Sequence, residues 1–147
     1  MKFIPAGEII GDAHQVRAVT IAKSPQIPDG EYQFVDMYCS DPLCDCRKTM
    51  IQVLHNGTNV ATINFGWESH TFYEKWMGSG SSDKSMPKMA GATTDITSVN
   101  RLSPDGILSL FNALLDDTWV EVFKRHYRLV KSRLRQDNGD RELKWNQ

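Results

Sequence analysis

The sequence contains no long apolar segment and no excess of charge of either sign. No stretch approaches the roughly 20 apolar residues of a membrane-spanning helix, and the N-terminus lacks the apolar run of about 7–15 residues of a signal peptide. With 17 Lys and Arg against 18 Asp and Glu, the formal net charge is −1. A strongly basic balance, typical of proteins that bind nucleic acid or anionic membranes, is therefore absent. We expect a cytoplasmic protein that does not associate with membranes.

The motifs of several enzyme classes are also absent. The chain has no H-E-x-x-H helix of zinc proteases, no H-x-E…P-C-x-x-C pattern of nucleobase deaminases and no G-x-S-x-G turn of serine hydrolases. The Gly/Ser-rich stretch at 78–87 lacks the G-K-[ST] ending of a phosphate-binding loop, so we expect a flexible surface loop. These absences favour a protein that is not an enzyme, with a zinc-dependent hydrolase as the less favoured alternative.

Cysteine is scarce, and the three that occur lie together in "YCSDPLCDC" at 38–46. An odd number cannot pair completely within one chain, and in a reducing cytoplasm clustered cysteines more often bind metals or perform redox chemistry than form structural disulfides. Cys44-Asp-Cys46 is not the C-x-x-C motif of thioredoxin-like proteins. We therefore favour a metal site, and a thiol sensor that releases its metal on oxidation is the alternative.

The spacing of the cysteines predicts that their sulfurs converge. Cys39 ends a predicted strand, and Asp41-Pro42 favours a type I turn that brings Cys44 back toward it. Cys44 and Cys46 are two residues apart, so in an extended chain both thiols point to the same side. Tetrahedral Zn²⁺ binds thiolates at about 2.3 Å. The predicted cofactor is zinc, although sites of this kind also accept iron.

A structural zinc site requires a fourth ligand, for which His126 is the first candidate. It falls on the inward stripe of the predicted last helix, and a histidine facing the core must satisfy both ring nitrogens. A Cys₃His site would then join the cysteine turn to that helix, with the second nitrogen held by a carbonyl or carboxylate. The alternatives are an ordinary core histidine at this position, or a ligand drawn from four other residues: His55, His70, Asp41 and Asp45.

The pattern of apolar residues predicts a single α+β domain spanning 1–147. Alternation predicts strands at 15–22, 31–39, 47–55 and 58–65, with a tight hairpin at Asn56-Gly57. Helical spacing predicts helices at 68–77, from Ser103 onward and at 117–136. We expect a loose or edge segment at 1–14 and a polar, frayed tail at 137–147. Strands first and helices last predict an antiparallel β-meander backed by C-terminal helices.

The last predicted helix also carries a basic face. Its cations recur at i, i+4, i+7 and i+11, which places them on one side: Lys124, Arg128, Lys131 and Arg135. Such a stripe can contact nucleic-acid phosphates. An ordinary solvated face, with cations favoured near the end of a helix by its dipole, is the more economical explanation.

Three stretches, "DMYCSDPLCDCRKTMIQV", "INFGWESHTFYEKWMG" and "FKRHYRLVK", resemble a family of uncharacterised, mostly bacterial zinc-chelating domains. That family carries a Y-C-x4-C-D-C-R motif and a late His-Tyr helix, and the resemblance covers about residues 31–131. It implies that Cys39, Cys44, Cys46 and His126 bind zinc, and it implies nothing about a substrate. We expect a small zinc-stabilised binding or adaptor module with a protein partner, or alternatively a nucleic-acid-binding protein.

Overall fold

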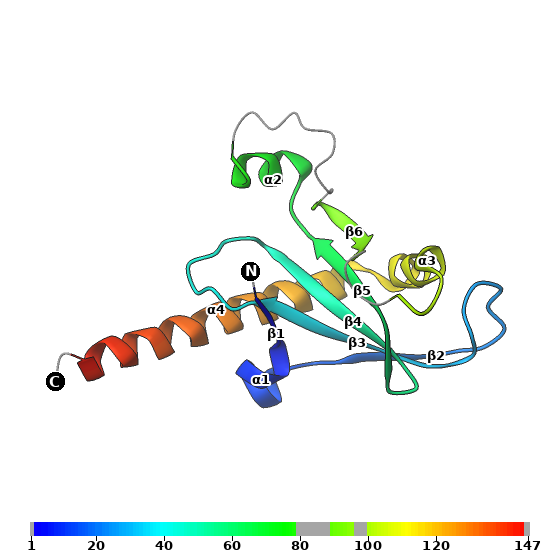
Figure 1. Cartoon of the computed structure of the whole chain (residues 1–147), viewed down its shortest axis with the longest axis horizontal. Helices are drawn as coiled ribbons and strands as arrows, with labels where there is room; N and C mark the ends of the chain where they lie inside the picture. Colours follow the sequence, from blue (N-terminus) through cyan, green and yellow to red (C-terminus); the bar gives the residue numbers. More distant parts are fainter. Residues whose placement is uncertain (1, 79–88, 96–99, 146–147) are drawn as a thin grey trace.

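The structure, a computed structural model, describes residues 2–78, 89–95 and 100–145, with side chains up to residue 137. The described residues fold into one antiparallel sheet and four helices, the two longest of which follow the last strand, and Figure 1 shows their arrangement. In chain order they are β1 (Phe3–Pro5), α1 (Ala6–Ile10), the 3₁₀ turn η1 (Gly11–Ala13), β2 (Arg17–Ile21), β3 (Gly30–Cys39), β4 (Lys48–His55), β5 (Thr58–Gly66), α2 (His70–Trp76), β6 (Gly91–Thr94), α3 (Pro104–Leu114) and α4 (Asp117–Trp145).

One antiparallel sheet contains all of these strands, in the order β1-β3-β4-β5-β6, with β2 also paired to β3. The predicted β-meander is confirmed, and it turns at Asn56 and Gly57, whose φ angles of 48° and 86° are the positive values that a tight hairpin needs. β1 and β2 share one edge of β3. β1 pairs with the end of β3, from Met37 to Cys39, and β2 pairs with the start of β3, from Gly30 to Phe34. Val35 and Asp36 lie between these two paired segments.

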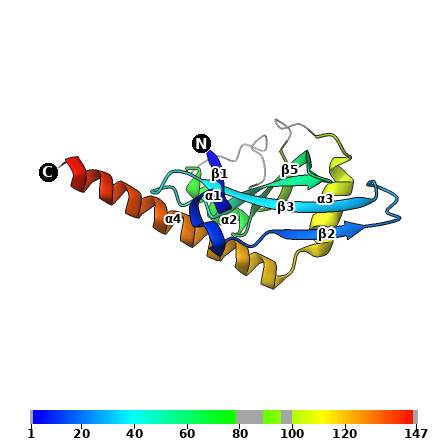
Figure 2. The same ribbon diagram turned by 90° about the horizontal axis from the view of Figure 1, so that it is seen from below.

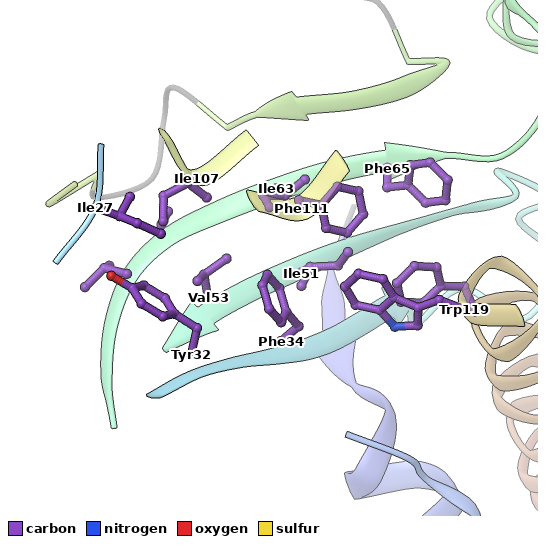
Figure 3. Packing of buried hydrophobic residues seen from close by; sticks show 13 residues of the cluster. Ile27, Tyr32, Phe34, Ile51, Val53, Ile63, Phe65, Ile107, Phe111 and Trp119 are labelled. Atoms are coloured by element: carbon purple, nitrogen blue, oxygen red, sulfur yellow. The ribbon is translucent and has the colours of Figure 1, made fainter. Parts of the chain in front are cut away.

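The main core lies between one face of the sheet and the helices α3 and α4. Alternation along β3 buries Tyr32, Phe34, Asp36 and Tyr38, as the sequence predicts. Figure 3 shows how aromatic and aliphatic side chains from the meander meet those of the two helices. The buried members of this cluster are Ile27, Tyr32, Phe34, Ile51, Val53, Val60, Ala61, Ile63, Phe65, Ile107, Phe111, Trp119 and Phe123.

Helices α2 and α3 each begin after a serine that caps the N-terminus. Ser103 accepts a hydrogen bond from the Gly106 N–H at the start of α3, and Pro104 occupies the first turn. Ser69 caps α2 in the same way through the Phe72 N–H. Figure 2 shows α4 running along the sheet and continuing well past it.

Several boundaries differ from those predicted. Residues 3–5 do form an edge strand, but Ala6 and Ile10 in α1 are buried against α4, so 1–14 is not a loose segment. α4 continues to Trp145 and does not end near 136, because nothing between 137 and 145 breaks a helix strongly enough. β6 was not predicted at all, since its four residues are too few for a period to show. The predicted flexible loop at 78–87 lies, apart from Gly78, outside the described residues.

Phe111 is the centre of the aromatic core, and we expect Phe111→Ala to destabilise the protein by about 3–5 kcal/mol. Its ring lies 5.1 Å from that of Trp119, 5.6 Å from Phe65 and 6.3 Å from Phe34. Urea denaturation measures the change in the free energy of unfolding. The adjacent exposed residue provides a control, because Asn112→Ala removes no buried contact and should change that free energy by less than about 0.5 kcal/mol. Similar values for both variants would contradict this assignment of the core.

Candidate metal centre

The three cysteines lie where β3 leaves the sheet and the chain returns to form β4. Cys39 is the last residue of β3, and Cys46 lies two residues before β4 begins. Between them the Cys44 N–H bonds to the Asp41 carbonyl at 3.2 Å, closing the turn that the Asp-Pro pair predicts. The Leu43 N–H also bonds to the Asp41 carboxylate at 2.9 Å. This local hydrogen bonding folds the loop back on itself.

The folded loop brings the three sulfur atoms together, each within 4.8 Å of the others. Sulfurs bound to a tetrahedral ion at about 2.3 Å lie about 3.8 Å apart, so a shift of about 1 Å or less would complete the geometry. Cys39 and Cys46 are buried and Cys44 is partly exposed, and none is in a disulfide. The three cysteines can therefore hold a metal ion.

Without a metal, the environment of Cys44 and Cys46 favours the protonated thiol. Burial, the neighbouring Cys46 and a hydrogen bond with Cys39 raise the pKa of Cys44 to about 12. Burial, with Cys39 next, also raises the pKa of Cys46, although the Lys48 N–H and the charge of Lys131 oppose that shift. Cys44 and Cys46 therefore differ from the low-pKa nucleophilic cysteines of thiol redox enzymes. A bound cation would reverse this preference.

Helix α4 holds the cysteine loop through three side chains. Lys131 is 3% exposed, and its ammonium donates to the carbonyls of Cys39, at 3.0 Å, and Asp41, at 2.5 Å. Tyr127 donates toward the Cys44 carbonyl at 3.3 Å, and Arg135 donates to the Pro42 carbonyl at 3.1 Å. The sequence predicts that a zinc ion bound by His126 links the turn to the last helix, whereas in the structure Lys131, Tyr127 and Arg135 connect the two.

His126 lies elsewhere, in a second polar cluster. Its Nδ1 is 2.6 Å from Oδ2 of Asp36, and its Nε2 accepts a hydrogen bond from the Gln15 N–H at 3.2 Å. The predicted Cys₃His set is thus corrected, because the described structure groups His126 with His14 and Asp36 and not with the sulfurs. The reason is register: Asp36 precedes Cys39 by three residues, or about 10 Å of strand.

The other candidates for a fourth ligand have different partners. The His55 Nε2 lies 2.9 Å from the Asp29 carbonyl, and His70 is exposed and paired with Glu74 at 2.8 Å. Asp45 is paired with Arg47 at 2.9 Å. Within the part of the chain that the structure describes, the group around the sulfurs consists of the cysteines alone.

The second cluster is a hydrogen-bonded network centred on a buried acid. Asp36 accepts from His14 Nε2 at 2.8 Å, from His126 and from the Tyr38 hydroxyl at 2.6 Å. Burial works against the carboxylate, but the hydrogen bonds from His126, Tyr38 and His14 outweigh it and lower the pKa of Asp36. His14 lies in the short connection between η1 and β2.

This network does not suit a metal ion, although its donor atoms lie close enough together. The Gln15 N–H donates to Nε2 of His126, so the imidazole hydrogen must be on Nδ1 and is donated to Asp36. Coordination through Nδ1 would move the hydrogen to Nε2, where it would face the Gln15 N–H. The arrangement therefore suits a structural link between the N-terminal segment, β3 and α4.

The predicted basic face is not a uniform solvated stripe. Lys131 is buried, and Arg135 is bonded to the cysteine loop. Lys124 lies 3.6 Å from Glu121. Arg128 is exposed, and the ion pairs found among the described residues do not include it. The four cations therefore have different roles.

No protein-family model, curated protein or solved structure significantly matches the chain. Among the described residues, no helix is both long enough and apolar enough to cross a membrane.

Sequence reasoning missed the Asp36 network and the role of Lys131. A signal for the network was present, because alternation in the predicted strand 31–39 places Asp36 on the core face, and the helical stripe places His126 there too. Two inward polar residues of complementary chemistry are natural partners. Burial of Lys131 gave no comparable signal, since a lysine in a basic run is normally exposed.

The depressed pKa of Asp36 predicts a pH-dependent contribution to stability. Because the folded value lies below the ordinary value of 3.8, the ionised network stabilises the protein above that pH. The contribution is lost as the pH falls through the folded pKa. We expect Asp36→Asn to cost about 3 kcal/mol near neutral pH and less in acid.

Urea denaturation of both proteins across the acidic range measures this difference in the free energy of unfolding. Asp12→Asn, at an exposed position, is the control and should leave it unchanged. A penalty for Asp36→Asn that is the same at all pH values would contradict a role for the ionised carboxylate.

Proposed function

We propose that the protein is a small binding or adaptor module in which Cys39, Cys44 and Cys46 hold one structural zinc ion. The observation that carries this proposal is the convergence of the three sulfurs next to a buried ammonium. Tetrahedral thiolate ligation is typical of structural zinc, and sets of three cysteines completed by another ligand are common. The resemblance to zinc-chelating domains supports the same metal.

Charge balance provides independent support for the metal. The ammonium of Lys131 is buried, and the contacts described for it are two carbonyl groups and the ring of Tyr127. A buried charge is costly unless an opposite charge lies nearby. Three thiolates and one Zn²⁺ carry a net charge of minus one, which Lys131 would neutralise. With protonated thiols and no metal, the compensation would be left to Asp45, which interacts electrostatically with Lys131 but is also paired with Arg47.

The metal would act through folding free energy, since binding three ligands from one loop fixes the loop's shape. That loop presents its carbonyls to Lys131, Tyr127 and Arg135, so a fixed loop also fixes the position of α4. At its tip Leu43 is 85% exposed, a large apolar side chain available to a protein partner. We propose that the fourth zinc ligand comes from outside the cysteine loop, as water or a side chain of that partner.

Metal content tests the proposal directly. We expect about one zinc per chain by elemental analysis of untagged protein purified without added metal. Cys44→Ser should lower metal content and thermal stability together, because it removes a ligand. His126→Ala is the matched comparison and should lower thermal stability while the metal content stays unchanged. Native protein that carries no metal and has three reactive thiols would overturn the proposal.

The role assigned to Lys131 has its own test. Lys131→Met keeps an unbranched side chain of similar length but removes the charge and both hydrogen bonds, so zinc affinity should fall about 10- to 100-fold. Competition with a chromophoric chelator measures the affinity. Lys124→Met, which removes the same charge from a more exposed position of the same helix, should leave it unchanged. Equal affinities in all three proteins would show that Lys131 does not compensate the site.

A further inference from the structure

Two neighbouring hollows lie along α4 beside the cysteine loop. The larger, of about 460 Å³, is lined by Asp45, Tyr127, Arg128, Lys131, Ser132, Arg135 and Gln136. The smaller, of about 240 Å³, is lined by Arg47, Trp67, Glu68, Lys124, Tyr127 and Arg128. Tyr127 and Arg128 belong to both linings, so the hollows adjoin. The larger has the volume of a small-molecule site.

The larger hollow is strongly positive. Three of its lining residues are cationic, and its one acid, Asp45, is already neutralised by Arg47 at 2.9 Å. Arg135 donates from its Nε to the Pro42 carbonyl, a contact that does not use the two terminal nitrogens of its guanidinium. Arg128 is exposed and enters no ion pair found among the described residues. Paired guanidinium groups of this kind suit a phosphate.

The smaller hollow combines aromatic rings with further cations. The rings of Trp67 and Tyr127 meet edge to face at 5.3 Å, and both side chains are partly exposed. Its acid, Glu68, lies 3.4 Å from Arg47, whose single charge it shares with Asp45. Aromatic side chains beside arginine are the usual surface for stacking a nucleobase. The smaller hollow therefore suits a nucleobase, and the larger hollow suits a phosphate.

We propose that the two hollows form one site for a nucleoside phosphate, with the base beside Trp67 and the phosphate between Arg128 and Arg135. The ligand is either a nucleotide unit of a single-stranded nucleic acid or a free nucleotide. The overall charge of −1 does not oppose such a site, because cations outnumber acids five to two in the combined linings. Neither lining includes a cysteine, but Tyr127, Lys131 and Arg135 contact the cysteine loop as well as the larger hollow. A variant at Arg128 therefore tests this site without removing a contact to that loop.

Fluorescence anisotropy with a labelled single-stranded oligonucleotide of about 12 nucleotides tests the site. Arg128→Gln should weaken binding about tenfold, because a charged contact to phosphate is lost. It should also reduce the slope of log affinity against log salt by about 0.7. The control is Arg133→Gln, an identical change at an exposed position of the same helix outside both linings, which should have little effect.

Unlabelled AMP, added as a competitor, distinguishes the two sources of the ligand. Displacement of the probe by AMP would identify a free nucleotide as sufficient, whereas displacement by unlabelled oligonucleotide alone would identify nucleic acid. Equal weakening by Arg128→Gln and Arg133→Gln would overturn the proposal, since it would show general attraction to a basic helix. Absence of probe binding at physiological salt would overturn it as well. Zinc content, measured on the same samples, should be equal in all three proteins.

Discussion

The buried ammonium of Lys131 joins the two halves of this fold. It donates to two carbonyls of the cysteine loop, and it does so from the middle of α4, 92 residues further along the chain than Cys39. A lysine in this position has given up its hydration, so the surrounding loop must supply both hydrogen bonds and negative charge. The two hydrogen bonds of Lys131 fix where the cysteine loop contacts α4, whereas the local hydrogen bonds to Asp41 shape the loop itself.

A second buried polar contact fixes the same helix against the same strand. His126 and Lys131 lie five residues apart on α4, and their partners Asp36 and Cys39 lie three apart on β3. Apolar packing alone tolerates sliding of a helix along a sheet, whereas two satisfied polar contacts allow one register. The two polar clusters therefore have different roles. The Asp36 network holds α4 against β3 through hydrogen bonds, and the cysteine loop provides ligands for a metal. Arg128 and Tyr127 are then held beside the loop, where the two hollows open.

Much of this arrangement could be predicted from sequence, and the limits have physical causes. Alternation in 31–39, the Asn-Gly turn and the Ser103 cap are local signals, and the elements that they predict are present. The convergence of Cys39 and Cys44 is also local, since one turn achieves it. The partner of His126 is not local, because it depends on how far α4 is displaced along β3. The expected ligand, His126, and the residue that contacts the cysteine loop, Lys131, are about 1.4 turns of helix apart. No pattern in the sequence specifies which of these two positions on α4 lies beside the loop. α1 was missed for a related reason, as five residues stabilised by packing on α4 show no period of their own.

The central claim is that three thiolates of one loop, and no histidine of this chain, bind zinc. X-ray absorption at the zinc edge of the purified protein tests it most directly. The account predicts three sulfur atoms at about 2.3 Å and one oxygen or nitrogen atom, without the outer-shell scattering of an imidazole ring. A shell dominated by nitrogen and oxygen, or a clear imidazole contribution, would contradict it.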